Sequence, residues 1–88
     1  MSEEVVREMV VGALEFSGSH IGVSISGIAG PSGGVLHKPV GTVCIAWGSK
    51  DKVNSNTFLF TGDRPQIRDS AIRQSLHLAL RFVREASI

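Results

Sequence analysis

The feature that most constrains this fold is the stretch GIAGPSGGVLHKP at residues 27–39. It holds four glycines and two prolines within thirteen residues, a composition that excludes a helix. So long a loop is uncommon in a small domain unless it serves a function. The chain therefore divides into a helix and a strand before this loop and two strands and a helix after it.

The part before the loop has a helical and then an extended pattern. Residues 2–16 predict a helix, because Ser2 can cap its N-terminus, two glutamates fill its first turn and Gly18 is a natural stop. Apolar residues recur there at helical spacing: Val6, Met9, Val10, Ala13 and Leu14. Residues 21–26 alternate apolar and small side chains and predict a strand whose two serines share a face.

The part after the loop begins with a predicted antiparallel hairpin. Residues 40–47 predict a second strand, and because neither of its faces carries a charge we expect it to be central. A polar turn at residues 48–52 leads into a third strand at residues 53–60. The third strand contains the polar run NSNT, so we place it nearer an edge of the sheet.

The last segment predicts a long helix. Asp63 as N-cap and Gln66 three residues later form a capping-box pattern, and Pro65 is tolerated in the first turn. One broad apolar arc runs along this helix: Ile67, Ala71, Ser75, Leu78 and Phe82 beside Ile72, Leu76, Ala79 and Val83. The order helix, strand, strand, strand, helix predicts one α/β layered domain over residues 1–88.

Composition excludes several classes of function. A formal charge of +1 gives no reason to expect nucleic acid or an anionic membrane as partner, and no apolar run approaches the roughly 18 residues of a membrane span. The acidic N-terminus is unlike a secretory signal, and a single cysteine, Cys44, excludes an internal disulfide, so we expect a cytoplasmic protein. His20, His37 and His77 lack metal-ligand spacing, and we expect neither a metal nor a cofactor.

Size suggests self-association. A domain of 88 residues buries only about 60–65% of its unfolded surface, and no disulfide framework or metal cluster is visible to stabilise it. Self-association is the remaining common remedy, so we expect a homo-oligomer.

The glycine-rich loop is the strongest signal of a binding site. Gly27, Gly30 and Gly33 are spaced three apart after a strand, and Gly34 adds further freedom. Glycines allow backbone N–H groups to converge on an anion. The spacing matches neither a Walker loop nor the dinucleotide fingerprint, and an idle connection between strands is the alternative.

Arginines at the start of the last helix are the second signal. Arg68 lies near the centre of the apolar arc, and Arg64 lies one turn earlier, so the two would suit a phosphate. A salt bridge from Arg68 to an acidic residue of the first helix is the alternative. Ser26, at the mouth of the loop, is a candidate hydrogen-bonding group. No base is fixed beside it, and we therefore assign no catalytic residue.

These segments together resemble the CinA C-terminal domain family. The resemblance rests on VSISGIAGP at residues 23–31, GG at 33–34, KPVGTV at 38–43 and FTGDR at 60–64 followed by Arg68. The opening SEEVVREM, with GAL at residues 12–14, is similar to the helix that precedes this signature. The resemblance covers nearly the whole chain.

The resemblance implies an α/β/α layered fold around a mixed sheet. It also implies deamidation of nicotinamide mononucleotide to nicotinate mononucleotide and ammonia. By the same resemblance Ser26, the glycine loop, Arg64 and Arg68 are expected to contact the substrate.

The sequence departs from the family in one decisive way. The family domain is nearly twice as long, and its first half carries a Ser-Cys-Thr-Gly-Gly motif with the presumed nucleophile and a Tyr-Ser-Asn-Glu-Ala-Lys motif with the presumed activating lysine. Neither motif occurs here. Val35 and Leu36 also stand where relatives are usually polar, which suggests a buried contact with a second copy.

Two interpretations of function remain. The first is a truncated, homo-oligomeric half-domain that binds a pyridine mononucleotide or phosphate without hydrolysing it. The alternative is the substrate-binding half of an active amidase completed by a partner chain. A weaker third possibility is an interaction module that binds no small molecule.

Overall fold

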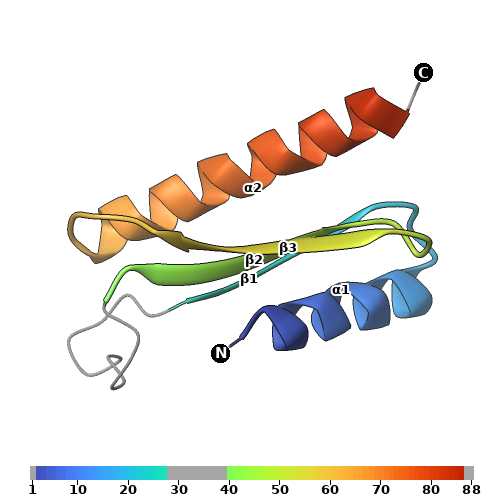
Figure 1. Ribbon diagram of the computed structural model, residues 1–88, viewed down its shortest axis with the longest axis horizontal. Helices are drawn as coiled ribbons and strands as arrows, with labels where there is room; N and C mark the ends of the chain where they lie inside the picture. Colours follow the sequence, from blue (N-terminus) through green and yellow to red (C-terminus); the bar gives the residue numbers. More distant parts are fainter. Residues whose placement is uncertain (1, 28–39, 87–88) are drawn as a thin grey trace.

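The computed structural model describes residues 2–27 and 40–86 and has the predicted order of elements. These are α1 (Glu3–Ser17), β1 (Gly22–Gly27), β2 (Thr42–Gly48), β3 (Val53–Leu59) and α2 (Arg64–Ala86). Figure 1 shows three layers, with α1 on one face of the sheet and α2 on the other. The α/β layered fold predicted from the sequence is confirmed, and element ends differ from the prediction by one or two residues.

The sheet has the strand order β1-β2-β3, and both pairs are antiparallel. The central position of β2 and the edge position of β3 were predicted and are confirmed. The pairing of β1 was not predicted: it runs along β2 from Gly22 opposite Gly48 to Gly27 opposite Val43. The parallel pairing that a mixed sheet would require is not present among these three strands.

The ends of α1 follow from its capping residues. The hydroxyl of Ser2 accepts a hydrogen bond of 3.2 Å from the amide of Val5, which satisfies one orphan donor of the first turn. Gly18 ends the helix in the left-handed conformation, with φ 72°, and its amide donates to the carbonyl of Leu14.

The start of α2 is the predicted capping box. The carboxylate of Asp63 accepts a 2.9 Å hydrogen bond from the amide of Gln66, and the Gln66 side-chain oxygen accepts a 2.8 Å bond from the amide of Asp63. This reciprocal pair fixes where the chain leaves β3 and in which direction α2 begins.

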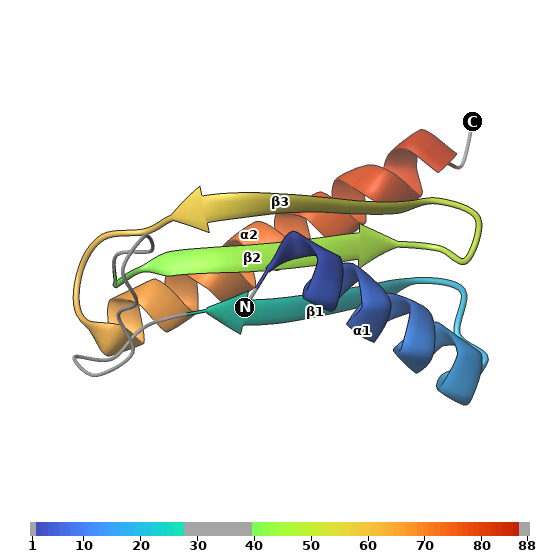
Figure 2. The ribbon, with the colours of Figure 1, turned by 60° about the horizontal axis from the view of Figure 1, so that its bottom comes forward.

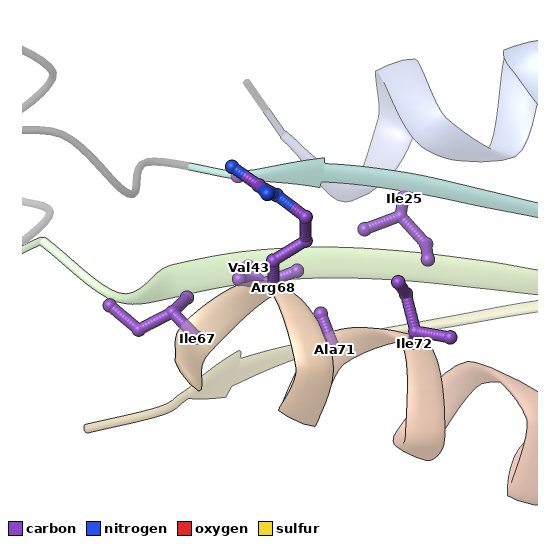
Figure 3. A pocket seen from close by; sticks show the side chains of 7 residues that line it. Ile25, Val43, Ile67, Arg68, Ala71 and Ile72 are labelled. Atoms are coloured by element: carbon purple, nitrogen blue, oxygen red, sulfur yellow. The ribbon is translucent and has the colours of Figure 1, made fainter. Parts of the chain in front are cut away.

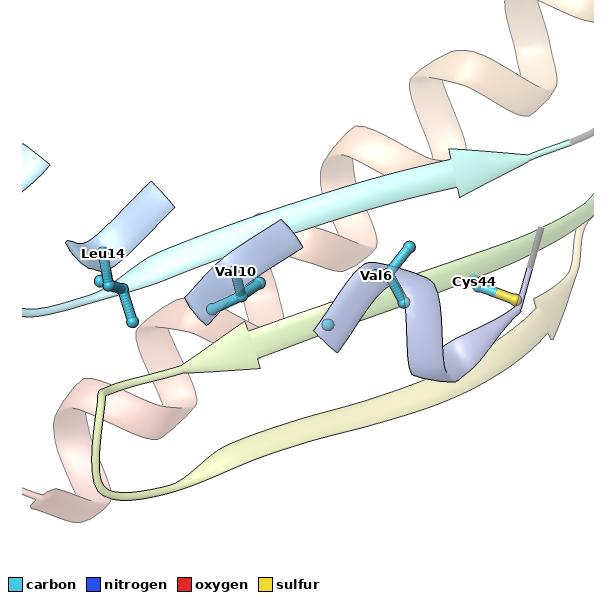
Figure 4. Close-up of a cluster of buried hydrophobic side chains, with 5 residues drawn as sticks. Val6, Val10, Leu14 and Cys44 are labelled. Atoms are coloured by element: carbon cyan, nitrogen blue, oxygen red, sulfur yellow. The ribbon is translucent and has the colours of Figure 1, made fainter. Parts of the chain in front are cut away.

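Two separate cores lie on the two faces of β2, because its side chains alternate in direction. Cys44 and Ala46 are buried under α1, against Val6, Val10 and Leu14 (Figure 4). Val43 and Ile45 are buried under α2, with Ile67, Ala71 and Leu78. The lack of charged side chains on both faces of β2 is thus explained by a helix on each side, α1 in front of the sheet and α2 behind it in Figure 2.

Gly41 sets the start of β2, two residues later than predicted. Its φ is 99°, and a Cβ atom there would collide with the carbonyl oxygen of Phe60. The Gly41 carbonyl in turn accepts a 2.9 Å hydrogen bond from the Phe60 amide. Only glycine suits this close crossing of two backbones, and the extended pairing begins after it at Thr42.

Candidate functional site

A hollow of about 200 Å³ lies between the start of α2 and the end of β1 (Figure 3). Its walls come from all the elements that meet there: Ile25 and Gly27 of β1, Val43 of β2, and Ile67, Arg68, Ala71 and Ile72 of α2. The lining that the described residues provide is apolar except for one cation. Residues 27 and 68, which the sequence analysis singled out separately, therefore meet at one place.

Gly27 is required at this place by close packing. A Cβ atom there would lie 2.8 Å from a methyl group of Val43 and 3.2 Å from the carbonyl oxygen of Thr42. A larger residue would push β1 away from β2 at the point where the glycine-rich segment begins. The absence of a side chain also keeps the backbone at the rim of the hollow accessible to a ligand.

Arg68 is exposed, and its side chain extends from α2 toward the end of β1 (Figure 3). The ion pairs of the described residues join Arg73 to Asp69 and Arg81 to Glu85, and neither involves Arg68. The alternative of a salt bridge to the first helix is not observed, because α1 lies on the opposite face of the sheet (Figure 1). Arg68 therefore offers its guanidinium donors to a ligand at the mouth of the hollow.

Arg64 is the first residue of α2, one turn before Arg68, and it is exposed. It is not among the residues that line the hollow. The structure thus brings both arginines to the N-terminal turns of one helix, at the positive end of its dipole.

Ser26 lies on the other face of the sheet. Its cross-strand partner is Cys44, which is buried under α1, whereas Gly27 is opposite Val43, which is buried under α2. Ser26 and Arg68 therefore do not line a common hollow. The expected contact of Ser26 with substrate stays a prediction.

Several other predicted site residues lie outside the described residues. These are Gly30, Gly33 and Gly34, and with them Val35 and Leu36 of the expected contact between copies. Within residues 2–27 and 40–86 no group of three or more His, Cys, Asp or Glu side chains is placed to hold a metal ion. Cys44 is buried.

The sequence analysis missed the apolar walls of the hollow. Ile25 and Val43 face α2 because they alternate along neighbouring strands, and Ile72 approaches them from the helix. The alternation itself was visible, but the antiparallel pairing of β1 with β2 was needed to place the three side chains together. A cation beside an apolar recess suits a ligand with an anionic group and a flat or apolar part.

None of the described helices is both long enough and apolar enough to cross a membrane.

Comparison with known proteins identifies the family. The family model of the CinA C-terminal domain matches residues 1–83. A nicotinamide-nucleotide amidohydrolase PncC of Enterobacter agglomerans is 48% identical over 82 residues, which are 92% of this chain and 50% of that protein. A CinA-like protein of Fervidobacterium nodosum is 54% identical over 68 residues, which are 77% of this chain and 17% of that protein.

Solved structures agree with this result. The competence damage-inducible protein A of Klebsiella pneumoniae superposes with a TM-score of 0.82 at 36% identity, over 88% of this chain and 48% of that one. The competence/damage inducible protein of Agrobacterium tumefaciens gives the same TM-score at 32% identity, over 89% of this chain and 48% of that one. The chain spans about half the length of the PncC relative and a smaller share of the other three proteins. It belongs to the CinA C-terminal domain family.

Proposed function

We propose that this chain is the ligand-binding half of a CinA-type nicotinamide-nucleotide amidase domain. It binds a pyridine mononucleotide, or the phosphate of one, and does not hydrolyse the amide by itself. It acts in the cytoplasm as a homo-oligomer.

The observation that carries this proposal is the hollow shared by Gly27 and Arg68. The two residues are 41 positions apart in the sequence, and each belongs to a segment that resembles the family signature. They line one recess of about 200 Å³ beside the N-terminus of α2. A phosphate at this end of the helix would meet the Arg68 guanidinium and the helix dipole, while the apolar walls would accommodate a ring.

The lack of hydrolysis follows from the chemistry of the lining. Amide hydrolysis by covalent catalysis needs a nucleophile and a base within hydrogen-bond reach of each other. The described lining offers aliphatic side chains, a glycine backbone and a guanidinium that stays protonated, so it supplies neither group. The two family motifs that carry a serine and a lysine do not occur in this sequence.

Isothermal titration calorimetry tests the binding. The probes are nicotinamide mononucleotide, inorganic phosphate and nicotinamide riboside, which lacks the phosphate. We expect the mononucleotide to bind more tightly than the riboside, and Arg68→Ala to weaken it by about tenfold, as the loss of a charged hydrogen bond implies. Arg73→Ala is the matched control, because Arg73 is exposed, pairs only with Asp69 among the described residues, and does not line the hollow.

Equal losses for Arg68→Ala and Arg73→Ala would contradict the site. So would a folded protein that binds none of the three probes at millimolar concentration. Ammonia release measured in the same samples tests the second half of the proposal, and we expect none above the background without protein.

A second candidate is an active amidase in which this chain is completed by another polypeptide. It is favoured by the PncC relatives, which are named amidohydrolases and of which this chain covers 50% and 48%. Ammonia release that requires both this chain and a co-purifying protein with the serine and lysine motifs would support this second candidate.

A further inference from the structure

A second recess, of about 310 Å³, lies between the sheet and the C-terminal half of α2. We call it the polar recess. Its floor is formed by Trp47 of β2 with Asn54 and Asn56 of β3, and α2 contributes Arg81 and Phe82. Among the described residues that line them, the polar recess and the hollow have none in common. Small-molecule sites typically measure about 300–1,000 Å³, so the recess has the volume of a small one.

The polar recess forms because α2 diverges from the sheet. Figure 1 shows α2 close to the sheet at its start and farther from it toward its C-terminal end. Figure 2 shows the helix crossing behind the strands from the end of β1 to β3. Leu78 is still buried, whereas Phe82, one turn later, is only half-buried. The last turns of α2 therefore leave a space above β3, and this space is the recess.

The register of β3 turns both asparagines toward α2. Asn54 lies opposite Trp47 and Asn56 opposite Ile45, and Ile45 is buried under α2. Directly opposed residues of an antiparallel pair point to the same face of the sheet. Phe58, the next residue of β3 on this face, packs against the core under α2. Asparagine is disfavoured in strands, and β3 carries it on this face where the recess opens.

The asparagine amides can still bind a ligand. Asn54 is half-buried, and its side chain makes no hydrogen bond within the described residues. The side-chain oxygen of Asn56 accepts a 2.9 Å hydrogen bond from the amide of Thr57, which leaves its NH₂ group as a donor. An amide with both its oxygen and its NH₂ group available pairs with a ring edge that carries a donor beside an acceptor. The amino edge of adenine has this pattern.

The charges of the polar recess favour an anion. Its lining carries the cations of Lys52 and Arg81 and the carboxylate of Glu85, a net positive charge. The Nε atom of Arg81 lies 3.4 Å from that carboxylate, so the two terminal nitrogens of the guanidinium can donate to a ligand. Lys52 forms no ion pair in the described part of the chain. These groups suit a phosphate.

The aromatic side chains favour a flat ring. Trp47 is half-buried, so part of its indole faces the polar recess, and Phe82 lines the recess from the helix. Nucleobases stack on such side chains, with tryptophan offering the largest surface. A carbohydrate also uses an aromatic face with amide groups, but the two cations favour a ligand that carries a negative charge.

We propose that the polar recess binds an adenine nucleotide. The base lies against Trp47, and its amino edge pairs with the Asn54 amide. Lys52 and Arg81 bind the phosphate at the mouth of the recess. This site is separate from the hollow in which we place the pyridine mononucleotide, so the proposal goes beyond the proposed function.

Fluorescence titration tests the proposal, because Trp47 is the only tryptophan of the chain and no tyrosine is present. The probes are adenosine monophosphate, inosine monophosphate and ribose phosphate. We expect adenosine monophosphate to quench the Trp47 emission along a saturable curve. Inosine monophosphate carries an oxygen in place of the amino group, so it should require about tenfold higher concentrations. Ribose phosphate has no ring to stack and should not quench.

Substitutions test which side chains hold the nucleotide. Asn54→Ala and Arg81→Ala should each raise the concentration of adenosine monophosphate at half-maximal quenching by about tenfold. Arg73→Ala is the matched control. Arg73, like Arg81, is an exposed arginine of α2 that pairs with a carboxylate four residues away, but it does not line the recess. This variant should titrate like the wild type.

Several results would overturn the proposal. One is a folded wild type whose Trp47 emission shows no saturable change with adenosine monophosphate at millimolar concentration. Others are equal affinities for adenosine and inosine monophosphate, or equal losses for Arg81→Ala and Arg73→Ala. The comparison of probes uses the wild type alone, so it does not depend on how the variants fold.

The two arginine sites separate this proposal from the proposed function. Quenching that Arg68→Ala weakens and Arg81→Ala does not would place the adenine nucleotide in the hollow and overturn the proposal. Quenching that depends on Arg81, in a chain that binds no nicotinamide mononucleotide by calorimetry, would support the polar recess and contradict the proposed function alone.

Discussion

The carboxylate of Glu3 accepts a hydrogen bond of 2.6 Å from the hydroxyl of Thr57, which joins the first turn of α1 to the edge strand β3. Its second oxygen accepts a 3.0 Å bond from Ser55, and Ser55 in turn accepts a 2.8 Å bond from the guanidinium of Arg7. Residues 54 positions apart in the sequence are thereby held together. This polar contact anchors α1 over β3, opposite the apolar side of the helix.

Removal of this anchor is expected to destabilise the fold. Hydrogen bonds to charged groups contribute roughly 1.5–3 kcal/mol each, and partial exposure reduces that figure, so Glu3→Ala should lower the free energy of unfolding by about 1–2 kcal/mol. Urea denaturation measures the change. Glu4→Ala is the control, because it removes the same first-turn charge but no contact with β3; equal losses would show that only the helix dipole matters.

The same contact should make stability depend on pH. Hydrogen bonds from Thr57 and Ser55, and the nearby Arg7 cation, lower the pKa of the Glu3 carboxyl below its ordinary value of 4.5, despite partial burial. A lowered pKa in the folded state means that the stabilisation is fully present above pH 4.5 and is lost as pH falls through the folded-state value. The stability difference between wild type and Glu3→Gln should therefore shrink between pH 5 and pH 2. A difference that grows on acidification would contradict the assignment.

Two glycines should respond to alanine in opposite directions. Gly41→Ala places a Cβ atom against the Phe60 carbonyl at a φ of 99°, and we expect a loss of at least about 2 kcal/mol. Gly12 lies within α1 with open space around its Cβ position, so Gly12→Ala should stabilise by about 0.5–1 kcal/mol through helix propensity. Thermal unfolding of both variants beside the wild type checks the two signs.

The capping box should affect both stability and ligand binding. Asp63→Ala removes the acceptor for the Gln66 amide and should cost about 1 kcal/mol. Because the box fixes the first turns of α2, the variant should also weaken mononucleotide binding through misplacement of Arg68. Asp69→Ala is the comparison, since it removes only an exposed pair with Arg73 and should leave both quantities nearly unchanged.

Local signals in the sequence predicted much of this fold. The pairing of Asp63 with Gln66 could be recognised because a capping box is formed within four residues. The central place of β2 followed from the lack of charge on both of its faces, which is unusual for a solvent-exposed strand. Both features depend on neighbours in the chain, so the sequence alone was sufficient.

Features that depend on distant segments were not predictable. The pairing of β1 with β2 spans the glycine-rich segment, which is too long for its turn residues to set a register. The anchor of Glu3 on Thr57 joins residues 54 positions apart. The family resemblance grouped Ser26 with Arg68 as expected substrate contacts. The pairing of Ser26 with Cys44, which only the structure shows, places the Ser26 side chain on the face of the sheet opposite the hollow.

The broad apolar arc of α2 illustrates the same limit. Helical periodicity placed Ile67 and Leu76 on one apolar arc of the helix. It does not say how much of that arc other segments of the chain cover. Ile67 is buried against the sheet, whereas Leu76 remains exposed.

The two cores on either side of β2 share one strand and no side chain. Substitutions that repack Val6, Val10 or Leu14 therefore do not touch the side chains that shape the hollow under α2. Packing under α1 and the shape of the proposed ligand site can be altered on separate faces of the same sheet. Mutations that reshape the proposed ligand site can therefore be offset by better packing under α1.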